Sequence, residues 1–230
     1  MLFAVEAVIR TPLVLEKNNM TNHDVLNKLV LKGTTTLGII CNDGVVLASD
    51  TRVTMGSYIA HKHGKKIYKI DDHLAMTISG SVADAQRVVE ILKANAQLYR
   101  LNVGRLMPVN SASRLIANIL FSSRYAPLIA QVLVGGIDDT GPHVFSLDPF
   151  GSLTEEKCVA TGSGSPIAYG VLEDRFKEGM TTKEVLPMII KAIDSAIKRD
   201  TASGDDFDIA LITEDGYREL TVDEKKLLVD

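Results

Sequence analysis

Cysteine and tryptophan are scarce in this sequence of 230 residues: it has two cysteines and no tryptophan. Cys41 and Cys158 each lie in a strand-like segment, with no cysteine or histidine nearby at the spacing of metal ligands. This pattern disfavours a disulfide framework, and we expect both thiols to be reduced core residues. His61 and His63 would share one face of a strand, but no acidic or sulfur ligand completes a metal site there. We therefore expect no metal and no cofactor.

Excess positive charge and long apolar runs are also missing. The net charge is -4 and the isoelectric point is about 5.8, so nothing favours nucleic acid or an anionic membrane as a partner. The apolar runs near the N-terminus are broken by Glu6 and Arg10 and have no basic segment before them, unlike a signal peptide. We expect a cytoplasmic protein with no membrane association.

The apolar pattern predicts runs of strands that alternate with runs of helices. Strands are expected over residues 34–80, 126–161 and 208–220, and helices over 83–102, from Ser111 (with Ser111 or Ser113 as N-cap), over 167–176 and over 182–198. This order favours an α+β domain of two facing antiparallel sheets with helices on the outer faces. No linker or repeat divides it.

The segment KGTTTLGII contains three consecutive threonines after Gly33. A strand that begins after a glycine turn is the ordinary interpretation. If Asn42-Asp43-Gly44 is a three-residue hairpin loop, Thr34 pairs with Arg52 and Thr36 with Asp50. Thr34, Asp50 and Arg52 then share one face of the sheet, whereas a two-residue loop would reverse that result.

A second interpretation is that the chain is cut between Gly33 and Thr34. A threonine hydroxyl needs an adjacent base to become a nucleophile, and an N-terminal threonine carries one in its α-amine, with a pKa of about 7.7 to 8.0. An amide nitrogen cannot act as that base. Residues 1–33 would then be a removable propeptide, residues 34–230 the catalytic domain, and Gly33 would leave space for attack on its carbonyl.

Several motifs in a fixed order resemble those of one family. They are GTTTLGI, ASDTRVTMG, HGKKIYKI, MTISGSVADAQ, LVGGID, TGSGSP and RDTASGDDFDIALIT, and they extend from Gly33 to about Leu220. Together they resemble the catalytic β-type subunits of the 20S proteasome, most closely the archaeal ones. The resemblance implies an N-terminal-nucleophile hydrolase fold, which is a four-layer αββα sandwich.

The resemblance also implies roles for individual residues. Thr34 matches the nucleophile and Gly33 the residue before the autocatalytic cut. The other matches are Asp50 and Lys66 as an ion pair beside the nucleophile, Gly80 as the oxyanion N–H donor, and Ser163, Asp200 and Ser203 as the polar group around the threonine amine.

Five further positions match the family's substrate-binding residues. Val53, Gly64, Ile78 and Val82 match the first specificity pocket, and Thr54 matches a residue that pairs with the substrate backbone. The pocket positions carry apolar side chains or none, so cleavage after large hydrophobic residues is expected.

The expected partners are proteasome α subunits and other β subunits, in four stacked heptameric rings of twenty-eight subunits. A regulatory ATPase would act indirectly, and the substrate would be unfolded polypeptide. Two alternatives are a catalytically silent ring subunit and a subunit of the bacterial two-ring ATP-dependent peptidase. A nucleotide site in TGSGSP is disfavoured because the pattern GxxxxGK[ST] is absent.

Overall fold

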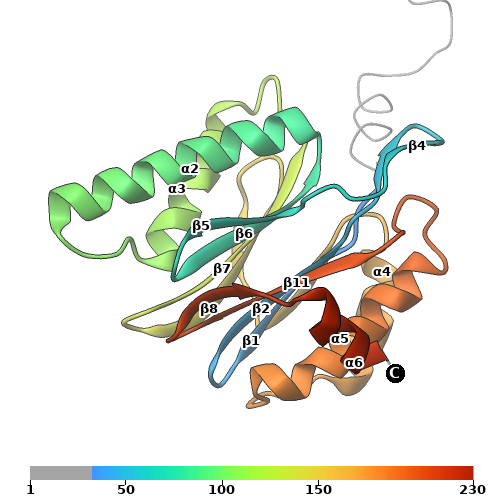
Figure 1. The fold of residues 1–230 in the computed structure, drawn as a ribbon. Coiled ribbons are helices and arrows are strands. Elements are labelled where there is room, and N and C mark those ends of the chain that lie inside the picture. Colours follow the sequence, from blue (N-terminus) through green and yellow to red (C-terminus); the bar gives the residue numbers. More distant parts are fainter. Residues whose placement is uncertain (1–32, 230) are drawn as a thin grey trace, which may run out of the picture.

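Two five-stranded antiparallel sheets and a two-stranded ribbon make up the strands of the computed structural model, which describes residues 33–229 (Figure 1). The expected propeptide, apart from Gly33, lies outside the described residues. The first sheet has the order β10 (Cys158–Thr161), β1 (Thr36–Cys41), β2 (Gly44–Asp50), β11 (Phe207–Thr213) and β12 (Gly216–Glu219). The second has the order β5 (Ile67–Asp71), β6 (Leu74–Gly80), β7 (Ala130–Asp138), β8 (Gly141–Leu147) and β9 (Leu153–Glu155). The ribbon pairs β3 (Val53–Met55) with β4 (Tyr58–His61).

Helices cover the outer face of each sheet (Figure 1). Helices α2 (Val82–Val103) and α3 (Val109–Ser122) pack on the second sheet, and α4 (Ser165–Arg175) and α5 (Thr182–Ile197) pack on the first. The αββα sandwich expected from the sequence is therefore confirmed. A short C-terminal helix, α6 (Val222–Val229), was not expected and packs against α5. Within residues 33–229, no helix is both long and apolar enough to span a membrane.

Strand β2 shows why the fold has four layers. All seven of its residues are buried, because one face meets the other sheet and the opposite face meets helices. Val45 and Leu47 join the apolar layer between the sheets, whereas Val46 and Ala48 join the layer under α4 and α5. Burial on both faces explains why the strand reads as an apolar run rather than as an alternating pattern.

The predicted register of the first hairpin is wrong. Cys41 pairs with Gly44 across a two-residue turn, and Thr36 pairs with Ser49 rather than with Asp50. Gly44 is a strand residue that also pairs with Thr213 of β11, and a Cβ on it would lie 2.2 Å from the Ile212 carbonyl oxygen. The glycine therefore permits the close approach of β11 and does not belong to the loop.

Two local predictions are also wrong. Neither Ser111 nor Ser113 caps α3: the helix begins after Pro108, and the Asp138 carboxylate accepts the Val109 N–H at 2.9 Å from the β7–β8 turn. A distant residue thus supplies the cap, which no local pattern could indicate. Strand β4 ends at His61, so His63 does not share a strand face with it.

The layer between the sheets should be sensitive to cavities. Leu47 is fully buried there, so Leu47→Ala should lower the free energy of unfolding by about 2–5 kcal/mol. Leu227, which is 81% exposed, provides the matched control, and Leu227→Ala should change stability by less than about 0.5 kcal/mol. Urea unfolding of the unassembled chains measures both, and equal losses would contradict the assigned core.

Candidate active site

Asp50 ends strand β2 and accepts four hydrogen bonds. Its Oδ1 accepts the Thr35 N–H at 2.9 Å and the Lys66 ammonium at 2.7 Å. Its Oδ2 accepts the N–H groups of Arg52 at 3.1 Å and Gly204 at 3.0 Å. The side chain is fully buried, so these donors replace water around a buried carboxylate.

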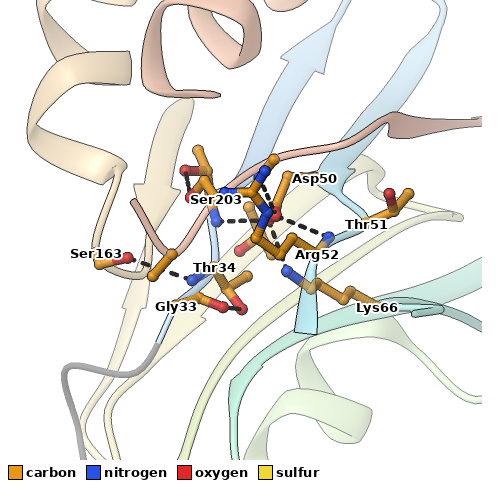
Figure 2. Close-up of polar contacts among 12 residues, drawn as sticks. Gly33, Thr34, Asp50, Thr51, Arg52, Lys66, Ser163 and Ser203 are labelled. Atoms are coloured by element: carbon orange, nitrogen blue, oxygen red, sulfur yellow. Dashed lines mark hydrogen bonds and ion pairs between the residues drawn. The ribbon is translucent and has the colours of Figure 1, made fainter. Parts of the chain in front are cut away.

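Lys66 lies just before β5 and points at Asp50, beside Thr34 (Figure 2). Its side chain is 7% exposed. Burial lowers the pKa of Lys66 below its usual value, while the charge of Asp50 and the hydrogen bond to it act in the opposite direction. The structure therefore brings Asp50 and Lys66 together as an ion pair, although the hairpin argument that placed Asp50 and Thr34 on one sheet face does not hold.

The backbone nitrogen of Thr34 lies at a second polar cluster. It donates to Ser163 Oγ at 3.3 Å (Figure 2). The hydroxyls of Ser163 and Ser203 both donate to Asp200 Oδ2, at 2.5 and 2.6 Å. Three residues named from the sequence thus form one network, which reaches Thr34 through its nitrogen.

The side chain of Thr34 faces the peptide bond that precedes it. Its hydroxyl donates to the Gly33 carbonyl oxygen (Figure 2). Gly33 has a φ of +51°, and a Cβ there would lie 2.5 Å from Thr54 Oγ1 and 2.7 Å from Ala202 Cβ. Glycine is required at this position for both conformation and space.

Three residues that sequence reasoning missed complete the surroundings. Thr35 bonds Asp50 through its N–H, and its hydroxyl lies 2.8 Å from Ser203 Oγ. Gly162 has a φ of +90°, and a Cβ on it would lie 1.9 Å from the Thr34 carbonyl oxygen. Gly204 donates to Asp50. The only sign of this close packing in the sequence is a glycine next to each of two serines: Gly162 precedes Ser163, and Gly204 follows Ser203.

A cavity of 290 Å³ opens beside Thr34. Besides Gly33 and Thr34, its lining includes six residues to which the sequence analysis gave a role: Val53, Thr54, Lys66, Ile78, Gly80 and Val82. Gly64 is not among the lining residues. A Cβ on Gly64 would lie 2.2 Å from Val53 Cγ2, so this glycine allows Val53 to take its place in the wall.

Gly80 stands at the end of β6 on the rim of this cavity. Its φ is +133°, and a Cβ would lie 2.1 Å from the Ile129 carbonyl oxygen. A side chain is therefore excluded where β6 gives way to α2, and the main chain itself borders the cavity.

Other features of the described chain do not form a comparable site. A larger hollow of 880 Å³ lies by the β11–β12 turn and α6, at the other end of β2, and the described residues that line it include none of the candidate site residues around Thr34. Between residues 33 and 229, no three His, Cys, Asp or Glu side chains are grouped as metal ligands. Cys41 and Cys158 are free thiols, and burial raises the pKa of each to about 12.

Comparison with known proteins now decides the family. The family model described as "Proteasome subunit" matches residues 30–212. The chain belongs to the proteasome subunit family. This confirms the resemblance seen in the sequence motifs.

Curated relatives narrow the assignment. The proteasome subunit beta of Methanosarcina barkeri is 49% identical over 201 residues, which cover 87% of this chain and 95% of the relative. That of Methanothermobacter thermautotrophicus is 51% identical over 199 residues, covering 86% and 95%. That of Ferroglobus placidus is 47% identical over 207 residues, covering 90% and 99%. The chain is a β-type member of the proteasome subunit family.

The ion pair of this β-type subunit can be tested directly. Asp50→Asn removes the charge that raises the pKa of Lys66 and leaves the burial that lowers it, so the pKa of Lys66 should fall further. NMR titration of ¹³Cε-labelled lysine in the unassembled chain measures the shift. Glu219→Gln is the control, because Glu219 pairs with the exposed Lys65 and not with Lys66. An unchanged or raised Lys66 pKa in Asp50→Asn would contradict this electrostatic account.

Proposed function

We propose that this chain is a threonine-type endopeptidase of the 20S proteasome core, made active by removal of residues 1–33. The observation that carries the proposal is the surroundings of Thr34. Its hydroxyl faces the Gly33 carbonyl, and its nitrogen faces the Ser163–Asp200–Ser203 cluster. A residue that acted only through its side chain would need no polar cluster around its backbone nitrogen.

Activation begins with the bond between Gly33 and Thr34. Thr34 Oγ1 loses its proton and attacks the Gly33 carbonyl carbon, and the C–N bond then breaks as the nitrogen gains a proton. The resulting ester joins Gly33 to Thr34 Oγ1. Water hydrolyses the ester, so residues 1–33 leave with a terminal carboxylate and Thr34 keeps a free α-amine.

Peptide hydrolysis then uses that amine as the general base. The amine takes the proton of Thr34 Oγ1 as the oxygen attacks the scissile carbonyl, and it returns a proton to the leaving amine. The acyl ester left on Thr34 is hydrolysed by water. The N–H of Gly80, at the rim of the cavity, stabilises the oxyanion, a contribution typically of about 2.7–4 kcal/mol for one such donor.

Lys66 and Asp50 tune this chemistry. A positive charge on Lys66 beside Thr34 favours the neutral form of the amine and a developing alkoxide. Asp50 keeps the buried ammonium in place, because its Oδ1 accepts a hydrogen bond from Lys66 Nζ, with 2.7 Å between the two atoms. On the other side, Ser163 and Asp200 orient the amine. The two networks thus act on different atoms of one residue.

Membership of the family supports a proposal for the assembly. We place the subunit in heptameric β rings stacked between rings of α subunits, in the cytoplasm, with unfolded polypeptide supplied through a regulatory ATPase. A closed chamber restricts hydrolysis to chains that are threaded into it.

Replacing the nucleophile tests the chemistry. Particles with Thr34→Ala in every β subunit should lose peptide hydrolysis and retain residues 1–33, because both reactions need the same hydroxyl. Thr34→Ser, which keeps a hydroxyl, should be cut and remain active at a reduced rate. Peptide assays and intact-mass measurement give the two readouts. Peptide hydrolysis by Thr34→Ala particles would refute the assignment of Thr34 as the nucleophile. If the parent chain itself stays full-length in assembled particles, it would instead be a catalytically silent ring subunit.

The cavity wall predicts the cleavage preference. Val53, Ile78 and Val82 are apolar, so hydrolysis of short fluorogenic peptides should be fastest after large hydrophobic residues. Val82→Glu should raise the rate of cleavage after arginine relative to the rate after large hydrophobic residues. Val82 is half exposed, so a carboxylate can be accommodated there at the cavity. Ala94→Glu, on an exposed part of α2, is the control. Preferred cleavage after arginine or glutamate by the parent particle would contradict the prediction.

A further inference from the structure

Arg52, just beyond β2, binds two residues of the loop formed by residues 200–206. Its Nε donates to Asp205 Oδ2 at 2.8 Å and its Nη2 to Asp205 Oδ1 at 3.4 Å. Its Nη1 donates to the Thr201 carbonyl oxygen at 2.9 Å. One guanidinium therefore joins the beginning and the end of the same loop.

The loop contains one residue in the left-handed region of the backbone. Asp205 has a φ of +67° and is the one non-glycine residue with positive φ among residues 33–229. Such backbone costs energy for most residues and persists where surrounding contacts enforce it. The ion pair with Arg52 is such a contact, and its side chains are only 19% and 16% exposed.

Gly204 shows how closely the guanidinium lies against the loop. A Cβ on Gly204 would lie 2.2 Å from Arg52 Cζ. The flat guanidinium thus covers the main chain of Gly204, which is buried. The Gly204 N–H points away toward Asp50 Oδ2, at 3.0 Å.

The same loop supplies both polar networks around Thr34. Asp200 and Ser203 belong to the cluster at the Thr34 nitrogen. Gly204 supports Asp50, which holds Lys66. A displacement of this loop would therefore disturb the amine and the lysine together.

We infer that the pair Arg52–Asp205 is a clamp that positions the 200–206 loop for catalysis. The inference rests on the proposed function of Thr34 and adds two positioning residues to it. Arg52 is also among the residues that line the cavity beside Thr34, but its guanidinium is bound to the loop, through Thr201 and Asp205. Asp205 does not line that cavity and acts through Arg52. Lysine could not replace this geometry, because a single ammonium cannot make the paired contacts of a planar guanidinium.

A pair of variants separates positioning from folding. Asp205→Gly removes the carboxylate but supplies the residue that best accepts positive φ, so a purely structural turn would be preserved. Asp205→Asn keeps a side-chain oxygen for Arg52 and is tolerated at positive φ. Lys62→Met is the matched control, since Lys62 acts on Asp205 only through its charge.

The measurement is peptide hydrolysis by assembled particles, with kcat expressed per mature Thr34 terminus counted by intact mass. Arg52→Met and Asp205→Gly should each lower kcat by roughly 10- to 100-fold with KM nearly unchanged. Arg52→Lys should recover part of the loss, and Asp205→Asn most of it. The double variant should be no worse than either single one, because the two residues act as a unit. Lys62→Met should match the parent.

The pH profile provides a readout that simple destabilisation would not move. When the loop is released, the Asp200 carboxylate no longer favours the charged form of the Thr34 amine. Removal of Arg52 alone also removes a positive charge, which would raise the pKa of the amine, so the double variant Arg52→Met/Asp205→Gly is used because it leaves the net charge unchanged. The acidic limb of kcat/KM in this double variant should move to lower pH. Parental kcat in both Arg52→Met and Asp205→Gly, or a loss confined to KM with an unmoved limb, overturns the clamp. If Thr34→Ala particles are inactive while the clamp variants keep parental activity, the clamp is refuted and the proposed function stands. If Thr34→Ala particles are active, the proposed function itself is refuted.

Discussion

The structure depends on one buried carboxylate that must be fully hydrogen-bonded. Asp50 has no contact with solvent, and an ionised group in that position is stable only if its oxygens are satisfied. Its four donors come from the residue before β1, from the second residue after β2, from the residue before β5 and from the 200–206 loop. The carboxylate therefore joins four parts of the chain at the point where the site forms.

This arrangement is present while Gly33 and Thr34 are still joined, before the cut that we propose. With Gly33 still attached, the Thr34 nitrogen already bonds Ser163, and Lys66 already bonds Asp50. Bond cleavage would change the Thr34 nitrogen from an amide to an amine without moving the groups around it. Preorganised groups of this kind need little rearrangement at the moment of reaction. The activating step is then a change in chemistry rather than a change of fold.

Much of the architecture could be predicted because it depends on patterns along the chain. The order of strands and helices follows from apolar periodicity, and the capping box of α5, between Thr181 and Glu184, is local. The hairpin register could not be predicted, since Gly44 suits both a turn and the close approach of β11. The N-terminal end of α3 could not be predicted either, because its cap, Asp138, is 29 residues away in the sequence.

The residues of the candidate site were proposed from two kinds of evidence. Thr34 was proposed from the chemistry of an N-terminal threonine, and Lys66 and Ser163 from motifs that resemble a family. The strand pairing that set Thr36 opposite Asp50 is wrong. Asp50 still pairs with Phe207 at the end of β2, and it meets Lys66, which lies just before β5 of the other sheet. The pairing of strands within one sheet cannot predict a contact between two sheets.

What sequence patterns encode least well is close approach of the main chain. Gly33, Gly162 and Gly204 each lie where a Cβ would collide with a neighbour, and those neighbours are Ala202, the Thr34 carbonyl and the Arg52 guanidinium. A glycine in a loop looks the same whether it forms a turn or makes room, so only the packing distinguishes the two. Under the proposed function, Thr34 acts through its backbone nitrogen as well as its side chain, so the groups that serve it must approach the backbone. The absence of side chains at these three positions is therefore as much a part of the site as the hydroxyls and charges that the sequence displays.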